Sequence, residues 1–148
     1  MWQAVEDFIG GGTYSDIYAQ RVNPSGVAQW TANGVAVCTA SDHQDQLGVV
    51  TDGSGGATIT WEDYRSGTNY DIYAQRVDPA GVPQWTANGV AICTASYDQE
   101  YLVVVGDGAG GAIIIWEDYR SGTNYDIYAQ RVDPAGVPQW TANGVAIC

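Results

Sequence analysis

The chain has 148 residues and a formal net charge of −12, with five arginines and no lysine. Phosphate backbones are bound by clusters of Lys and Arg, so this charge balance argues against a nucleic-acid partner. No stretch approaches the roughly 20 consecutive apolar residues that a membrane-spanning helix needs, and we expect no membrane partner.

A 55-residue repeat organises the sequence. Residues 61–93 and 116–148 are identical at every position, so the offset is 116 minus 61, or 55. The segment Asp16–Cys38 matches the corresponding part of both copies at all but four positions. A period of this length, built from strand-like segments, indicates a propeller or another repeat array.

The repeat divides the chain into three units of one array. Residues 1–38 are an incomplete unit that lacks its first strand, and 39–93 and 94–148 are the second and third units. Met1–Asp7 aligns with residues 57–63, so the sequence starts inside a repeat. We interpret the chain as a segment of a longer array, natural or constructed.

Four strands are expected in each complete unit, and the third unit shows them in chain order. The first is the apolar run 102–105, and the second is the apolar run 112–116. Runs that are apolar on both faces suit strands that are covered on both sides. The third, 126–132, is more polar, and the fourth begins at Pro138 and continues to Cys148. This gradient predicts the first strand nearest the axis of the fold and the fourth at its rim.

Glycine-rich segments at 52–56 and 107–111 join the first two strands of the complete units and are interpreted as hairpin turns. A phosphate-binding loop would need a following helix and a lysine, and a calcium loop would need several converging oxygen ligands. Neither pattern is present, so we expect no metal site and no cofactor.

One cysteine recurs in each unit, at Cys38, Cys93 and Cys148. The chain has no Cys-x-x-Cys pair and His43 is its only histidine, which argues against zinc. Equivalent positions on neighbouring sheets are expected to lie beyond the about 7 Å that a disulfide allows. We therefore predict buried thiols that fill the core, with Cys148 at the terminus open to adventitious cross-linking.

Three patterns in the repeat carry a resemblance to a known family. Gly-Gly-Ala-x-x-x-Trp-x-Asp-x-Arg, then Asp-Ile-Tyr-Ala-Gln-Arg, then Asp-x-x-Gly-x-x-x-Trp are similar to bacterial extracellular propeller repeats of the sialidase-like, Asp-box class. In that class an aspartate and a glycine shape the hairpin before the fourth strand, and a tryptophan packs beneath it. The corresponding residues here are Asp78, Gly81 and Trp85, and again Asp133, Gly136 and Trp140. Trp30 takes the same place in the first unit, and the spacing is longer than that of the usual Asp-box.

The resemblance implies an all-β fold of β-propeller blades, each of four antiparallel strands, and a secreted or cell-surface parent protein. A propeller needs typically four to eight blades to close its ring, and fewer than three blades leave unpaired faces and edges. We therefore predict that the ring is completed by homo-oligomerisation, with six blades in a homodimer. An open β-solenoid or a domain-swapped assembly is the structural alternative.

Polar and aromatic residues recur in one surface loop of the second and third units. These candidate ligand-binding residues are Asp63, Tyr64, Arg65, Asn69 and Tyr70, and again Asp118, Tyr119, Arg120, Asn124 and Tyr125. Aromatic faces and polar side chains suit sugars, and weak repeated sites gain by multivalency. The first unit has Asp7, Phe8, Ile9 and Gly10 instead, so a site there should be weaker or absent.

Catalysis requires a unique constellation of groups with different environments, whereas nearly identical repeats give identical environments. We therefore predict a non-catalytic propeller module that self-assembles into a symmetric ring and acts as an interaction scaffold, with itself as the partner. Two alternatives stay open. One is a multivalent lectin that binds glycans, and the other, more remote, is a fragment of a sialidase-like glycoside hydrolase.

Overall fold

The computed structural model describes residues 14–148 and, for the backbone, residues 2–7. All regular structure within these residues is β-strand, and no helix that could span a membrane occurs among them. The strands are β1 (Trp2–Asp7), β2 (Asp16–Arg21), β3 (Val35–Cys38), β4 (Gln44–Thr51), β5 (Ala57–Asp63), β6 (Asp71–Val77), β7 (Val90–Cys93), β8 (Gln99–Gly106), β9 (Ala112–Asp118), β10 (Asp126–Val132) and β11 (Val145–Ala146).

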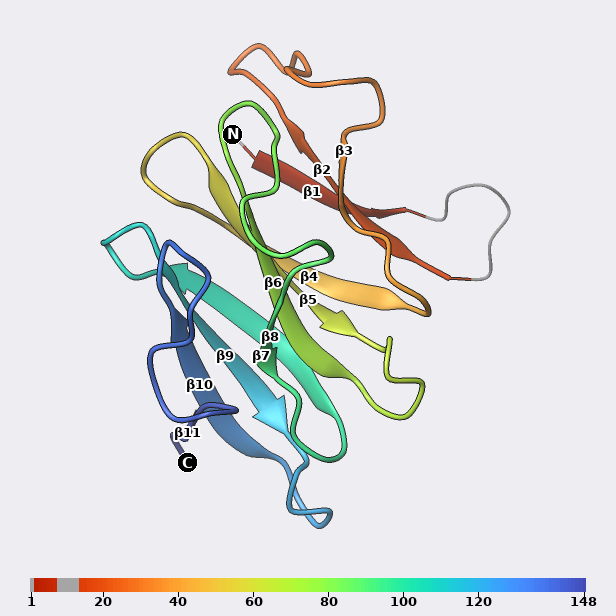
Figure 1. The fold of residues 1–148 in the computed structure, drawn as a ribbon, viewed down its shortest axis with the longest axis vertical. Helices are drawn as coiled ribbons and strands as arrows, with labels where there is room; N and C mark the ends of the chain where they lie inside the picture. Colours follow the sequence, from red (N-terminus) through yellow and green to blue (C-terminus); the bar gives the residue numbers. More distant parts are fainter. Residues whose placement is uncertain (1, 8–13) are drawn as a thin grey trace.

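The strands form three antiparallel sheets in the described residues, in the orders β1-β2-β3, β4-β5-β6-β7 and β8-β9-β10-β11. The sheets follow one another from the N-terminal to the C-terminal end of the chain, and each is made of consecutive strands (Figure 1). β4 contacts β1, and β8 contacts β4, so the first strands of neighbouring sheets are neighbours. The prediction of an all-β antiparallel fold is confirmed. The described residues make an open row of sheets that does not close into a barrel or a ring.

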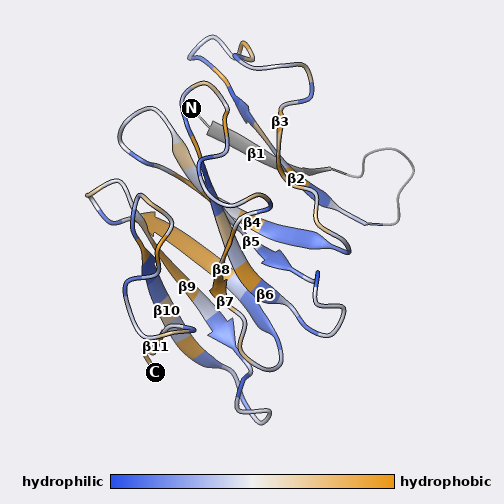
Figure 2. Cartoon of the chain, viewed as in Figure 1, coloured by the Kyte–Doolittle hydropathy of each residue, from blue (hydrophilic) through white to orange (hydrophobic). Residues whose placement is uncertain are grey.

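β8 carries a bulge near its start, where its pairing with β9 shifts between Glu100 and Val103. Beyond the bulge the side chains alternate between the two faces of the sheet. Leu102 and Val104 pack in the apolar cluster between the second and third sheets, whereas Val103 and Val105 are exposed. The third sheet therefore has one covered face and one open face, and β8 is coloured as hydrophobic over most of its length (Figure 2).

The fourth strand begins later than predicted, although it lies within the predicted segment from Pro138 to Cys148. Pro138 makes only an isolated bridge with Val132, and the fourth strand of the third sheet is Val145–Ala146. The reason lies in a side chain, because the amide oxygen of Gln130 accepts the backbone N–H of Trp140 at 2.9 Å. This bond diverts the segment after Pro138 from the ladder, and regular pairing resumes only after a further turn.

Two apolar clusters hold the sheets together, one in each gap between neighbours. Trp61 and Ile59 of β5 are fully buried in the first cluster, and Trp116 and Ile114 of β9 are buried in the second. Complete burial of one such aliphatic or aromatic side chain contributes roughly 1.5–3 kcal/mol. The apolar interior of the fold therefore lies between the sheets.

Two of the three cysteines are buried and the third is exposed. Cys38 and Cys93 are buried in the two clusters, which confirms their interpretation as core residues. Burial raises the pKa of the Cys38 thiol to about 11 and that of Cys93 to about 12. Cys148 is exposed, since no further sheet covers it in the described residues, and it is therefore open to the cross-linking expected at the terminus; all three are free thiols.

The glycine-rich segment at 52–56 is a hairpin turn, as predicted. One carboxylate oxygen of Asp52 accepts the backbone N–H groups of Ser54 and Gly56 at 2.8 and 2.9 Å. The other oxygen forms an ion pair with Arg76 of β6 at 2.8 Å. Burial raises the pKa of Asp52, but these hydrogen bonds outweigh it and leave the pKa below its usual value.

Candidate functional site

Asp63 and Arg65, both predicted to bind a ligand, form an ion pair with each other. Asp63 ends β5 and is fully buried, and its two carboxylate oxygens accept hydrogen bonds from Nε and Nη2 of Arg65 at 2.8 and 2.5 Å. The carboxylate also accepts the indole N–H of Trp61 at 2.7 Å. The placement of Asp63 as a surface-loop ligand was therefore wrong, because its carboxylate is enclosed and used by its own neighbours.

Arg65 also fastens the first sheet to the second. Its Nη2 donates to the backbone oxygen of Asn88 at 2.8 Å and to Sγ of Cys38 in β3 at 3.3 Å. Its guanidinium lies 3.8 Å above the ring of Tyr73. The side-chain oxygen of Asn88 in turn accepts the backbone N–H of Thr39 at 3.0 Å. We call such a contact zone between neighbouring sheets a joint, and Arg65 is a structural residue of the first joint.

The same contacts recur 55 residues later in the second joint. Arg120 bonds both oxygens of Asp118 at 2.8 and 2.5 Å, and its Nη2 donates to Asn143 O at 2.8 Å and Cys93 Sγ at 3.4 Å. Asn143 accepts the backbone N–H of Thr94 at 3.0 Å. Burial raises the pKa of Asp118, but the hydrogen bonds from Arg120 and the neighbouring indole outweigh it and lower the pKa overall.

The predicted tyrosines are brought together in pairs. The rings of Tyr64 and Tyr70 lie 5.0 Å apart, and those of Tyr119 and Tyr125 lie 4.9 Å apart. Each pair is at least partly open to solvent, which keeps it available for a ligand. The prediction that the first unit lacks this loop concerns Phe8–Gly10, which lie outside the described residues.

The predicted asparagines stabilise the loops. The side-chain nitrogen of Asn69 donates to a carboxylate oxygen of Asp71 and to the backbone oxygen of Tyr97, both at 3.0 Å. Asn124 bonds Asp126 in the same way at 2.8 Å. Each amide thus bonds the carboxylate two residues along the chain, and Asn69 also links its loop to the backbone at Tyr97.

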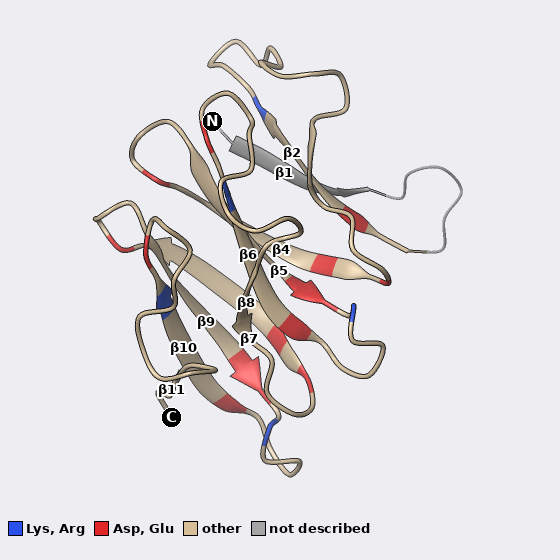
Figure 3. Ribbon diagram, viewed as in Figure 1, with Lys and Arg blue, Asp and Glu red and all other residues tan. Residues whose placement is uncertain are grey.

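A hollow of about 310 Å³ lies between the second and third sheets beside the first tyrosine pair. Its lining residues are Asp45, Gln46, Glu62, Tyr70, Glu100 and Tyr101. The hydroxyl of Tyr70 donates to Asp45 at 3.2 Å, and burial together with this carboxylate raises the pKa of Tyr70 to about 12. Figure 3 shows acidic residues on β4, β5 and β8, and this concentration of negative charge disfavours anionic ligands.

Sequence reasoning missed the three carboxylates of this hollow. The signal available was the equivalence of Asp45 and Glu100, since 100 minus 45 is 55. In the described part of the chain no group of three or more His, Cys, Asp or Glu side chains is arranged to hold a metal ion.

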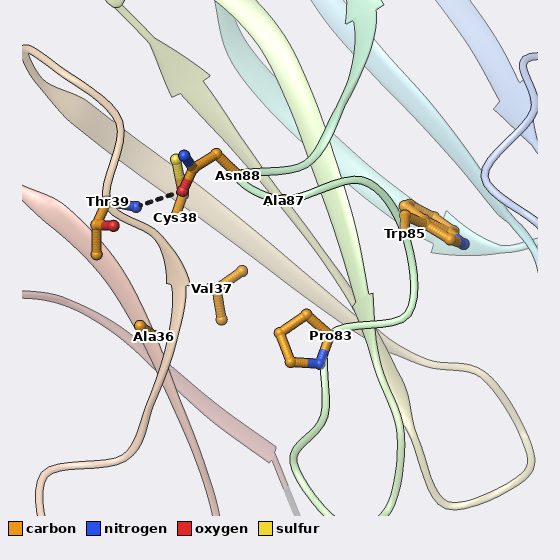
Figure 4. Close-up of a pocket in the computed structure, with 8 residues that line it drawn as sticks. All are labelled: Ala36, Val37, Cys38, Thr39, Pro83, Trp85, Ala87 and Asn88. Atoms are coloured by element: carbon orange, nitrogen blue, oxygen red, sulfur yellow. Dashed lines mark hydrogen bonds between the residues drawn. The ribbon is translucent and has the colours of Figure 1, made fainter.

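A second hollow, of about 320 Å³, opens beside the first joint. It is lined by Ala36, Val37, Cys38, Thr39, Pro83, Trp85, Ala87 and Asn88. Figure 4 shows the hydrogen bond between Thr39 and Asn88 at its edge, with Trp85 set apart from the other side chains and pointing away from them. None of the predicted ligand-binding residues lines this hollow.

Trp85 is directed at the next unit. Its indole N–H donates to the backbone oxygen of Pro134 at 3.1 Å, and a Cβ added to Gly136 would lie 2.7 Å from its ring. The expectation that Trp85 packs beneath its own turn, which contains Gly81, was therefore wrong. The turn of the following unit covers it instead.

Trp30 makes the same contact one unit earlier. Its indole donates to the backbone oxygen of Pro79 at 3.2 Å, and a Cβ on Gly81 would lie 2.9 Å from its ring. Trp140, the third equivalent, is 38% exposed, because no following turn covers it in the described residues. Each joint thus combines the tryptophan of one unit with the turn of the next.

The open face of the third sheet is apolar. We define it by Val103, Val105, Ile113, Ile115, Trp140 and Ile147, of which Val103 pairs with Ile115 and Val105 with Ile113 across β8 and β9. On the second sheet, the equivalents of Ile113 and Ile115 are Thr58 and Thr60, which are buried against the third sheet.

None of the known family models matches the chain, and no curated protein or solved structure matches it either. The two internal joints are thus the template for interpreting the open face.

Proposed function

We propose that the chain is a non-catalytic repeat module that assembles with copies of itself and serves as an interaction scaffold. The observation that carries this proposal is a contrast between equivalent residues. Ile92 is 2% exposed where the third sheet covers it, whereas Ile147, its equivalent on the open face, is 59% exposed. Contiguous exposed apolar surface of this kind marks interaction sites on proteins.

Burial of the open face would stabilise an assembly. Fully burying an aliphatic side chain contributes roughly 1.5–3 kcal/mol, and Val103, Val105 and Ile147 are all exposed. Trp140 adds one of the residue types, with Tyr and Arg, that are enriched among the energetically dominant residues of interfaces. These contributions oppose the entropy lost on association.

A second copy is the proposed partner, because the chain already covers the equivalent face of its first and second units with a sheet of its own kind. The second and third sheets have four antiparallel strands each and the first has three, and sheets of this kind stacked side by side fit the blades of a β-propeller. A ring needs four to eight blades, so two chains with three sheets each suffice. We therefore propose a homodimer that closes a six-bladed ring.

The absence of catalysis in this proposal is supported by the use of the charged residues. Asp63 with Arg65 and Asp118 with Arg120 make the same bonds in two equivalent joints. Two copies of one structural ion pair do not supply the distinct acid and base that hydrolysis of a glycoside requires.

Glycan binding is a second candidate, favoured by the repeated tyrosine pairs. Tyr64 with Tyr70 and Tyr119 with Tyr125 give two similar aromatic surfaces at least partly open to solvent, and a dimer would present four. Tryptophan fluorescence and the thermal midpoint of unfolding should shift with at least one sugar of a broad panel. No shift with any sugar would contradict glycan binding and leave self-assembly untouched.

The test of self-assembly compares two variants with the unaltered chain by sedimentation velocity. Val103→Glu places a charge on the open face, and Val82→Glu places the same charge on a turn outside it; the two valines are 58% and 52% exposed. We expect Val103→Glu to dissociate the assembly and Val82→Glu to leave it intact. Equal assembly of both variants would contradict the role of the open face.

A further inference from the structure

We propose that the open face docks head-to-tail on the first unit of a second copy, with Trp140 seated against the turn from Asn23 to Gly26 of that copy. This inference rests on the proposed self-assembly and specifies its geometry. The chain builds the same contact twice internally, between Trp30 and the turn at Gly81 and between Trp85 and the turn at Gly136.

The chain carries one unused half of this contact at each end of its row of sheets. Trp140 is exposed, whereas Trp30 and Trp85 are partly buried by the following turn. Gly26 is exposed, and no described residue lies within 4 Å of a Cβ built on it, whereas Gly81 and Gly136 are buried under an indole. The first unit therefore offers a turn without a tryptophan, and the third offers a tryptophan without a turn.

The unoccupied turn already has the conformation of the occupied ones. Gly26 has a φ of 78°, close to the 86° of Gly81, and its N–H donates to Asn23 O at 2.9 Å. The side-chain oxygen of Asn23 accepts the N–H groups of Ser25 and Val27 at 2.9 and 3.0 Å. Because the turn is preorganised without a tryptophan, docking requires little further ordering there.

A second donor points to the same partner. Arg21 and Arg76 donate from Nη1 to Pro79 O and Pro134 O of the following units, at 3.3 and 3.4 Å. Arg131 is their equivalent on the third sheet, and it pairs with Ile113 across β9 and β10 on the side of the open face. The carbonyl of Pro24 in a second copy completes the set, as the acceptor for both Arg131 and Trp140.

Head-to-tail docking covers both Gly26 and Trp140, whereas packing two open faces on each other does not. A face-to-face dimer would bury apolar surface but leave Gly26 uncovered and give Trp140 no turn carbonyl. A head-to-tail interface is heterologous, so it closes into a ring or continues as a filament. Two such interfaces close the six-bladed dimer.

Mixing of complementary variants tests this geometry. We call the open face with Trp140 the head and the turn from Asn23 to Gly26 the tail. Trp140→Ala removes the indole of the head, and Gly26→Val fills the space that the indole would occupy at the tail. We expect each variant alone to self-associate about tenfold or more weakly than the unaltered chain, as loss of a dominant interface residue does. An equimolar mixture should recover a dimer in light scattering, because one intact head meets one intact tail. Circular dichroism of each variant verifies its fold.

Cross-linking supplies an independent readout that does not depend on the Gly26 variant. With p-benzoylphenylalanine in place of Trp140, and isotope-labelled and unlabelled chains mixed, the expected link between copies joins tryptic peptides 132–148 and 22–65. The matched control is the same substitution at Trp85, which should link peptides 77–120 and 132–148 within one chain.

The outcomes separate this inference from the self-assembly on which it rests. Normal assembly of Gly26→Val, no dimer in the mixture, or links from 132–148 only to 77–120 or 132–148 of another copy would overturn head-to-tail docking and leave self-assembly standing. A monomeric unaltered chain at every concentration would remove both.

Discussion

The indole N–H of Trp85 donates to the backbone carbonyl of Pro134 at 3.1 Å, across 49 residues of sequence. The donor belongs to the second unit and the acceptor to the turn of the third. Because the repeat places both groups in every unit, each unit supplies the turn for the one before it and depends on the one after it. In the described residues the turn at Gly26 has no tryptophan over it and Trp140 has no turn over it, which is the physical basis of the proposed assembly.

The contact between Gly136 and Trp85 should be sensitive to a single methyl group. A Cβ at Gly136 would lie 2.7 Å from the indole at a φ of 85°, so Gly136→Ala should lower the free energy of unfolding by about 2–4 kcal/mol. Gly108→Ala is the matched control, since Gly108 has a φ of 79° and nothing within 4 Å of an added Cβ. It should lose only about 1 kcal/mol from backbone strain. Equal losses in urea titrations would contradict the importance of the tryptophan contact.

The ion pair between Asp118 and Arg120 should make stability depend on acid pH. The pKa of Asp118 is lowered in the folded chain, so its contribution is present above the unfolded pKa of about 3.9 and is lost as the pH falls through the folded value. Asp118→Asn should lower the free energy of unfolding at neutral pH by about 2–3 kcal/mol, below the range for fully buried pairs because Arg120 is partly exposed. The difference between the two proteins should shrink below pH 4; a constant difference would argue against the ion pair.

Asp71 should give stability the opposite dependence on pH from that given by Asp118. Burial raises the pKa of Asp71 and the hydrogen bond from Asn69 lowers it, and burial has the larger effect, so the pKa in the folded chain is about 6. Between about pH 4 and pH 6 the folded chain therefore holds a proton that the unfolded chain has released. Stability should therefore fall as the pH rises from 4 through 6. Asp71→Asn should increase the free energy of unfolding at pH 7 by about 1–2 kcal/mol and have little effect at pH 4. Asp126→Asn, at the less buried equivalent position, is the control and should show a smaller gain.

The three thiols should differ in reactivity. Cys38 and Cys93 are buried and their pKa values are raised to about 11 and about 12, whereas Cys148 is exposed. Thiolate is the reactive form, so an aromatic disulfide reagent should modify Cys148 first and the other two only when the fold opens. Mass spectrometry of the partly modified chain identifies the site, and early modification of Cys38 or Cys93 would contradict the buried placement.

The second and third strands of the third unit were predicted best from the sequence. The run 112–116 corresponds to β9, and 126–132 corresponds to β10 without a change of bounds. The start of the fourth strand could not be placed from residue preferences, because the diverting bond between Gln130 and Trp140 is made by a side chain. A run of strand-forming residues does not show where a side chain replaces the ladder.

The candidate site was predicted less well than the fold. Exact repetition shows that Asp63 and Arg65 recur, but a repeated pattern is the same whether a pair faces solvent or closes a joint. The partner of Trp85 was missed for a related reason, since every unit contains both a tryptophan and a turn, and the sequence does not indicate which of two identical turns is nearer. Only the three-dimensional offset between neighbouring sheets distinguishes them.

The native mass of the unaltered chain in solution tests the central claim most directly. Light scattering on a size-exclusion column, over a range of loading concentrations, should give a mass near twice the 15.8 kDa of one chain, as two chains of three sheets would in a closed ring. A stable mass of 15.8 kDa at every concentration would show that the open face is left uncovered and would contradict assembly.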